Sequence, residues 1–222
     1  KRIQYVKLYS NGINNRFKLL INQYHLNEVE FLENDLAIDV GANIGEMSLI
    51  LSKYYKCETY SVEPEEDEFE CLKLNLNNYR GSFLNNPLWY EEKSLSFYSA
   101  NEELDSSCFE TEDYTHVLIK KAKTLSSIIN SFNGRRIKFL KLEAEGAEPE
   151  ILKGGLDTLH LVDYISVDVG PERGLSYETT LVSTVNILKN CGFDFVKMGH
   201  PRLICLFKNK LTPPIVLSGE LS

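Results

Sequence analysis

The feature that most constrains the fold is the run from Asp39 to Gly45, which reads Asp-Val-Gly-Ala-Asn-Ile-Gly. Apolar residues 36–38 precede this run and apolar-rich residues 47–51 follow it, an order that predicts a buried strand, a glycine turn and a helix. Gly41 and Gly45 permit backbone angles closed to other residues and let a ligand approach without a Cβ in the way. The helix start adds unpaired N–H groups and the positive end of a dipole. We therefore expect a ligand-binding turn in an α/β protein.

The spacing of the glycines argues against a dinucleotide, because a pyrophosphate-binding turn needs G-x-G-x-x-G and the third glycine is absent here. Asp39 would repel phosphates but would attract the ammonium and sulfonium groups of S-adenosylmethionine. A second acid, Glu63, follows the strand-like residues 59–62, roughly 20 residues past the turn, where nucleotide-binding folds place an acid on the ribose. These two acids predict S-adenosylmethionine as the cofactor. The alternative is a turn that only reverses the chain.

The whole chain of 222 residues is predicted to form one α/β domain, since no linker, repeat or low-complexity tract interrupts the alternation of strands and helices. We expect a lead-in segment over residues 1–35, the main domain over 36–210 and a peripheral tail over 211–222. The lead-in segment either caps the cofactor or packs on the domain. Because the first residue is Lys1 and not Met, we expect a trimmed chain or an excised domain, so the sequence does not indicate whether a targeting segment belongs to the protein.

Charge and cysteine usage limit the partners. Lys plus Arg number 24 and Asp plus Glu 32, which gives a formal net charge of −8, and the basic cluster at 120–123 is short. Nucleic acid is therefore not expected as a partner. No run of about 18 apolar residues is present, so no membrane span is expected. The five cysteines are odd in number and widely spaced, which favours reduced thiols and a cytoplasmic location. The oligomeric state is not indicated.

The order of the remaining elements follows from the hydrophobic pattern. One helical turn is expected within residues 28–33. Strands are predicted at 36–41, 57–63, 82–89, 115–119, 137–142 and 164–169, with an edge strand at 95–100 and an antiparallel hairpin of residues 193–198 and 202–208. Helices are predicted at 44–55, 66–78, 125–132 and 178–190. Residues 101–113 are polar and form either a loop over the ligand or an ordinary surface loop.

A second acidic constellation, Lys-Leu-Glu-Ala-Glu-Gly-Ala-Glu, spans residues 141–148. It lies where the strand at 137–142 would pass into a helix, and ligands of open parallel sheets bind outside such carboxyl ends. If this strand neighbours the Asp39 strand, Glu143 and Glu145 lie in or beside the same crevice, and they share one face by alternation. For Glu145 and Glu148 the alternative role is stabilisation of the helix N-terminus, worth about 0.3–1 kcal/mol each.

Taken together, the Asp39–Gly45 turn, Glu63-Pro64, Asn75, Leu125 and the block from Lys141 to Gly154 resemble the FkbM family of S-adenosylmethionine-dependent methyltransferases. The resemblance covers roughly residues 30–208, and the Glu-Gly-Ala-Glu block is its most specific part. It implies a three-layer Rossmann-like α/β fold with a mostly parallel seven-stranded sheet and the last strand antiparallel. It also implies O-methylation of a hydroxyl on a sugar, glycan or secondary metabolite. One departure is Glu143, where the family usually has Asp.

The resemblance further implies a cofactor-binding set. Asp39, Gly41, Asn43 and Gly45 would contact the methionine part, and Glu63 would contact the ribose. Asn85 and Asn86 would lie near adenine unless they form a simple Asn-rich turn. The set consists of Asp39, Gly41, Ala42, Asn43, Gly45, Glu63, Pro64, Asn85 and Asn86.

Methyl transfer requires in-line alignment and exclusion of water, and a hydroxyl acceptor also gains from a base. Glu143 and Glu145 are the first candidates, since a carboxylate in a closed crevice can have its pKa raised toward neutrality. His200 and His116 come next, although both also suit an ordinary surface position. Asp168 is a strand-end acid that would orient the substrate or bind magnesium with Glu143, but no metal-ligand cluster is visible in the sequence.

Three other functions compete with this prediction. Within enzymes they are an N-methyltransferase and a nucleotide-binding oxidoreductase on a similar sheet. Outside enzymes, the competing function is an inactive methyltransferase-like binding module, suggested by the Glu143 departure.

Overall fold

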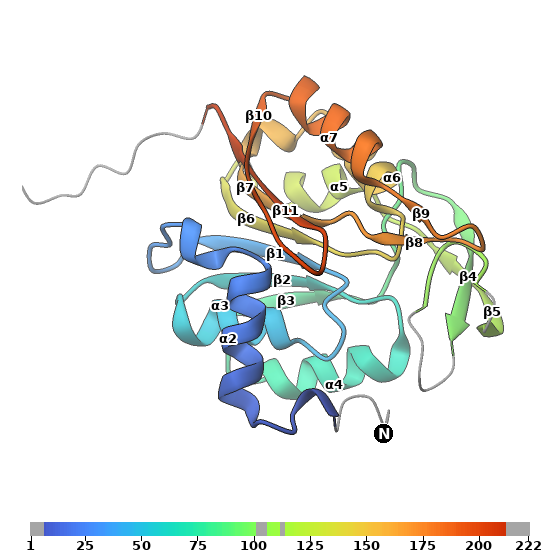
Figure 1. Cartoon of the computed structure of the whole chain (residues 1–222), viewed down its shortest axis with the longest axis horizontal. Coiled ribbons are helices and arrows are strands. Elements are labelled where there is room, and N and C mark those ends of the chain that lie inside the picture. Colours follow the sequence, from blue (N-terminus) through green and yellow to red (C-terminus); the bar gives the residue numbers. More distant parts are fainter. Residues whose placement is uncertain (1–6, 101–105, 112–113, 212–222) are drawn as a thin grey trace, which may run out of the picture.

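A computed structural model describes residues 7–100, 106–111 and 114–211. Its centre is a seven-stranded sheet in the order β10-β11-β7-β6-β1-β2-β3 (Figure 1). The strands are β1 (Leu36–Val40), β2 (Glu58–Val62), β3 (Gly81–Leu84), β6 (Ile137–Leu142), β7 (Val162–Asp168), β10 (Phe193–Met198) and β11 (Ile204–Asn209). The five neighbours β7, β6, β1, β2 and β3 pair in parallel, whereas β11 is antiparallel to both β7 and β10. This confirms the predicted architecture and the reversed last strand.

Helices cover both faces of the sheet, which explains why the central strands are buried throughout. On one face lie α2 (Ile13–Gln23), α3 (Glu46–Tyr54) and α4 (Glu66–Leu76), and on the other lie α5 (Leu125–Asn130), α6 (Glu148–Lys153) and α7 (Leu181–Asn190) (Figure 1). The two main apolar clusters follow this division. One contains side chains of α2 and α3, and the other contains side chains of α5, α6 and α7.

The strand order turns at the centre of the sheet, because β1 lies between β2 and β6. From β1 the chain proceeds outward through β2 and β3, and it then returns to the other side of β1 as β6. The helices that follow β1 and β6 therefore leave from the same carboxyl edge. This is the place where an open parallel sheet forms a ligand crevice, and the predicted neighbourhood of the Asp39 strand and the strand at 137–142 is confirmed.

Two strand predictions were wrong in part. The strand expected at 82–89 ends at Leu84, because Asn85 turns away and its side-chain amide donates to the carbonyls of Glu63 and Pro64. The edge strand expected at 95–100 does form, as β4 (Ser94–Ala100), but it pairs with β5 (Tyr114–Lys121) in a separate two-stranded sheet. A residue pattern can predict a strand, but it does not identify the strand's partner.

Two helical predictions also need correction. The helix expected from residue 178 begins at Leu181, because the Thr179 hydroxyl accepts from the Leu181 N–H, and residues 178–179 form β9 beside β8 (Pro171–Arg173). Near the N-terminus the helical turn expected within 28–33 lies earlier, as the 3₁₀ turn η1 (Leu26–Glu28), and α2 was not predicted. A second 3₁₀ turn, η2 (Leu159–Leu161), precedes β7. The expected tail falls outside the described residues except for Leu211.

Candidate active site

A cavity of about 260 Å³ lies at the carboxyl ends of β1, β2 and β6. Seven of the predicted site residues line it: Gly41, Ala42, Asn43, Glu63, Pro64, Glu143 and Glu145. Asp39, Gly45, Asn85 and Asn86 are not among the lining residues. The α2 side of the cavity is formed by Leu8, Arg16, Leu20 and Tyr24, and residues 106–108 from the loop expected at 101–113 close another side.

The glycine turn is shaped by close packing. Gly41 has φ +69°, and a Cβ on it would lie 1.9 Å from the backbone oxygen of Glu143. Gly45 has φ +91°, and a Cβ there would lie 2.7 Å from a methyl group of Leu72 on α4. The two glycines therefore let the end of β6 and the helix α4 approach the turn. Their first role is to build the wall of the cavity.

Glu63 holds the turn from the end of β2. One carboxylate oxygen accepts from the Asn43 N–H at 2.7 Å, and the other accepts from the Glu65 N–H at 2.8 Å. Burial raises the pKa of Glu63 to about 7, and the two N–H groups act in the opposite direction. Beside it, Oε1 of Glu65 is buried at the cavity and has no hydrogen-bond partner among the described residues. This unpaired acceptor beside Glu63 suits a hydroxyl group of a ribose.

Asp39 lies beneath the turn and is fully buried. Its Oδ2 accepts from the backbone N–H of Ser48 at 3.0 Å and from the Ser48 hydroxyl at 2.6 Å. Its Oδ1 lies 3.3 Å from Nζ of Lys141. This carboxylate therefore ties the first turn of α3 to β1 and neutralises a buried lysine, and a direct contact with the methionine part stays a prediction.

Glu143 is held by three donors from three parts of the chain. Tyr24 donates its hydroxyl to Oε2 at 2.5 Å, Nζ of Lys141 lies 3.0 Å from the same oxygen, and Arg202 donates to Oε1. Burial opposes the charged form, but the attraction of Lys141 and Arg202 and the Tyr24 hydrogen bond lower the pKa of Glu143 to about 2. The expectation that this pKa rises toward neutrality is wrong, because two cations share the crevice. A carboxylate with so low a pKa is a poor proton acceptor at neutral pH.

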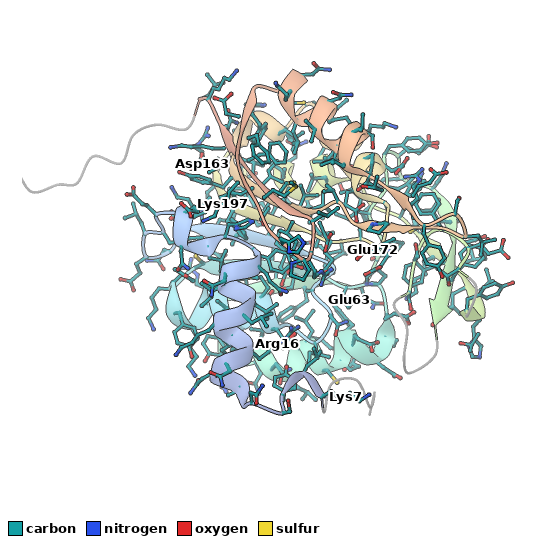
Figure 2. The ribbon with its side chains drawn as sticks, viewed as in Figure 1. Lys7, Arg16, Glu63, Asp163, Glu172 and Lys197 are labelled. Carbon is teal, nitrogen blue, oxygen red and sulfur yellow. The ribbon has the colours of Figure 1, made fainter. Side chains whose placement is uncertain are left out.

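Arg202 also joins Glu143 to Asp168. It donates to Oδ2 of Asp168 and lies 3.6 Å from Oε1 of Glu172. Its guanidinium group thus occupies the place where the sequence allowed a magnesium ion, and the described residues contain no group of three or more potential metal ligands suited to an ion. Figure 2 shows Glu63 and Glu172 on the side of the sheet where the parallel strands end, whereas Asp163 lies at the opposite side, at the start of β7.

The other acids of the block have separate roles. Glu145 lines the cavity with φ +48°, and its carbonyl accepts from the Ser107 hydroxyl at 2.9 Å. Glu148 turns back so that Oε1 accepts from the N–H groups of Ala144 and Gly146, and burial raises its pKa to about 7. Glu150 pairs with Arg173 at 2.7 Å. Of the two candidate bases, Glu145 is therefore the one that the geometry favours.

The remaining predicted residues lie away from the lining. Asn85 binds the carbonyls of Glu63 and Pro64, and Asn86 donates to the carbonyl of Lys121 at 2.8 Å, so both amides hold loops together. His116 and His200 are exposed, and neither lines the cavity. Proximity of the two asparagines to adenine stays a prediction.

Several lining residues were not predicted. Arg16 binds Glu46 at the start of α3 through two hydrogen bonds of 2.8 and 2.7 Å, and Tyr24 and Arg202 hold Glu143. Only Lys141 carried a usable signal, because a lysine near the end of a buried, largely apolar strand needs acidic partners. Arg16, Tyr24 and Arg202 lie in segments whose residue pattern does not indicate that they reach the cavity.

The strand order and the crevice at its switch point define a Rossmann-like methyltransferase fold. A family model described as the methyltransferase FkbM domain matches residues 39–195. This chain belongs to that family. Membership of a methyltransferase family is consistent with S-adenosylmethionine as the cofactor.

Two named proteins are similar to this chain at low sequence identity, and a solved structure is reported beside them. The hexuronic acid methyltransferase AglP of Haloferax volcanii is 29% identical over 142 residues, which cover 62% of this chain and 56% of that protein. Methyltransferase 1 of Beauveria bassiana is 24% identical over 172 residues, 65% of this chain and 68% of that protein. The chain thus spans little more than half the length of the first relative. A solved precorrin-6y C5,15-methyltransferase from Geobacter metallireducens is 10% identical with a TM-score of 0.49, covering 83% of this chain and 86% of that one.

Proposed function

We propose that this chain is an S-adenosylmethionine-dependent O-methyltransferase that acts on a hydroxyl group of a sugar or a small metabolite. The observation that carries the proposal is the cavity itself, which Gly41, Ala42 and Asn43 of the glycine turn line together with Glu63 and Glu143. Six acidic residues line the cavity against three basic ones, Arg16, Lys141 and Arg202, and this excess of acids suits a cationic donor better than a phosphate. The Haloferax relative is named a hexuronic acid methyltransferase, and this name supports a sugar acceptor.

The residues present fit this cofactor. Glu63 and Glu65 offer acceptors to ribose hydroxyls, and the apolar side chains of Leu88, Phe97 and Ile151 suit a flat base. When bound, the cofactor supplies a methyl group already activated by the sulfonium, so the protein has to align the acceptor and exclude water. Glu145 is the lining carboxylate that we assign to accept the proton of the acceptor hydroxyl.

The test is calorimetry of the purified chain with S-adenosylmethionine, S-adenosylhomocysteine and NAD, followed by transfer of labelled methyl to neutral and acidic sugars. We expect micromolar binding of the first two ligands and none of NAD. Glu63→Gln should weaken binding of S-adenosylhomocysteine about tenfold or more, because an amide cannot accept from both the Asn43 and Glu65 N–H groups. Binding of NAD alone would refute the proposal.

A second candidate function is a binding module that retains the cofactor cavity without methyl transfer. It is favoured by the low pKa of Glu143, which removes one of the two candidate bases. Cofactor binding without transfer to any member of a broad glycan and metabolite panel would support this second function.

A further inference from the structure

Glu143 is the meeting point of three separate parts of the fold. Tyr24 follows α2, Lys141 belongs to β6, and Arg202 lies in the connection between β10 and β11. We call Glu143 and these three partners the Glu143 cluster. All four residues line the cavity, so the cluster forms one of its walls.

Two members of the cluster come from outside the family match at residues 39–195. Tyr24 precedes the match and is almost fully buried, with its backbone N–H bonded to the carbonyl of Leu20. Arg202 follows the match and spans Glu143 and Asp168. The carboxylate inside the family block therefore depends on the two flanking segments for two of its three partners.

The arrangement leaves Glu143 little capacity for proton transfer. Both of its oxygens already accept from charged or hydroxyl donors, and a carboxylate fixed by such bonds holds its neighbours in place. We propose that Glu143 is a positioning residue that fixes α2 and the β10–β11 connection against the cavity, so that the wall is formed before any ligand binds. The consequence for methyl transfer rests on the proposed function, whereas the ordering of the wall does not.

A second group of contacts fixes α2 near its other end. Arg16 binds Glu46 at 2.7 Å, and the Tyr9 hydroxyl donates to the same carboxylate at 2.6 Å. These contacts hold the first half of α2 and the segment before it to the start of α3, whereas the Tyr24–Glu143 bond holds the far end. Loss of the Tyr24 hydroxyl should therefore loosen the end of α2 that faces Glu143 and leave the Arg16 end in place.

The first experiment compares Tyr24→Phe with Tyr54→Phe, an exposed tyrosine of α3 away from the cavity. Amide hydrogen exchange of the full chain without ligand should become several-fold faster at residues 20–24 in Tyr24→Phe and stay at the wild-type rate in Tyr54→Phe. Binding of S-adenosylhomocysteine should weaken about tenfold in Tyr24→Phe, because part of the free energy of binding is then needed to order the cavity wall. Unchanged exchange and affinity in Tyr24→Phe would overturn the proposal.

The second experiment is a double-mutant cycle with Glu143→Gln. If the two side chains act through one bond, the double variant should bind S-adenosylhomocysteine no more weakly than the weaker single variant. Additive losses, or a lower melting temperature with unchanged affinity of the folded protein, would show a merely structural role and overturn the proposal. Should Glu143→Gln fail to fold, the Tyr24→Phe result decides alone.

Failure of the proposed function gives a different result. Wild-type protein that binds neither S-adenosylmethionine nor its product refutes the function. The exchange rates at residues 20–24 still test the positioning role in that case.

Discussion

At the scale of single residues, the structure gives different surroundings to two carboxylates that look alike in the sequence. Glu143 is fixed by Tyr24, Lys141 and Arg202, whereas Glu145 lines the cavity two residues further along. The sequence located both acids because the strand end at 142 is clear. It could not distinguish them, since the partners of Glu143 lie at positions 24 and 202, far from the block in the chain.

Glu145→Gln should slow methyl transfer by about a hundredfold or more, because an amide cannot take a proton from the acceptor. Binding of S-adenosylhomocysteine should change far less. The measurement is a transfer rate at saturating cofactor beside a calorimetric affinity. As controls, His116→Ala and His200→Ala should keep the wild-type rate, since both residues are exposed and lie outside the lining. Equal activity in Glu145→Gln would remove this residue from the chemistry.

Gly41→Ala tests the close approach of β6 to the turn. The new Cβ would lie 1.9 Å from the Glu143 carbonyl oxygen at φ +69°, so the backbone has to shift and the free energy of unfolding should fall by about 3 kcal/mol or more. Gly192→Ala is the matched control, because φ is +87° there but nothing lies within 4 Å of a Cβ. It should cost about 1 kcal/mol in urea unfolding.

At the scale of elements, the order of strands and helices from 36 to 76 and the terminal hairpin followed from the sequence, because their apolar runs are long and bounded by turn residues. The β4–β5 sheet did not follow, since the partner of an alternating strand is chosen in three dimensions. The helix α2 was missed although Phe17, Leu20 and Tyr24 recur at helical spacing. Its start carries no side-chain cap, since Gly12 stands at that position, so the usual signal for a helix N-terminus is missing.

A pair of leucines on α2 tests how this helix is attached. Leu20 is 5% exposed and lines the cavity, whereas its neighbour Leu19 is 45% exposed. Leu20→Ala should lower the free energy of unfolding by about 2–4 kcal/mol and weaken binding of S-adenosylhomocysteine. Leu19→Ala should change either quantity little. Equal effects of the two variants in urea unfolding and calorimetry would contradict the described packing of α2.

At the scale of the whole molecule, buried acids give the stability an unusual dependence on pH. Burial raises the pKa of Glu63 and of Glu148 to about 7, so the folded state binds more protons than the unfolded state between about pH 4.5 and 7. Stability must therefore fall as the pH rises through this range. Glu143 acts in the opposite direction, since its pKa of about 2 makes stability fall as the pH drops from about 4.5 to 2.

We accordingly expect the free energy of unfolding to be greatest near pH 5, measured by urea unfolding at several pH values. Glu148→Gln should flatten the decline between pH 5 and 7, because the amide can still accept from Ala144 and Gly146 and no longer titrates. Glu33→Gln, an exposed carboxylate, is the control and should keep the wild-type slope. A stability that rises steadily from pH 5 to 8 would contradict the described burial of these acids.

Other whole-chain expectations have mixed outcomes. All five cysteines are free thiols, as their number and spacing predicted. Among the described residues, no helix combines the length and the apolar character needed to cross a bilayer. The mostly parallel seven-stranded sheet is confirmed, whereas the acceptor stays a proposal because the loops around a fixed scaffold vary freely.

The placement of Tyr24 and Arg202 has a consequence for the order in which the protein is made. Synthesis proceeds from the N-terminus, so the glycine turn and both acidic strand ends leave the ribosome well before Arg202 and the inner strand β11. Until then Glu143 lacks one of its two cations, and β7 lacks one of its two neighbouring strands. Competence to bind a ligand is thus acquired late in translation, and a nascent chain stalled before Arg202 should hold S-adenosylhomocysteine poorly even though every residue of the glycine turn is already present.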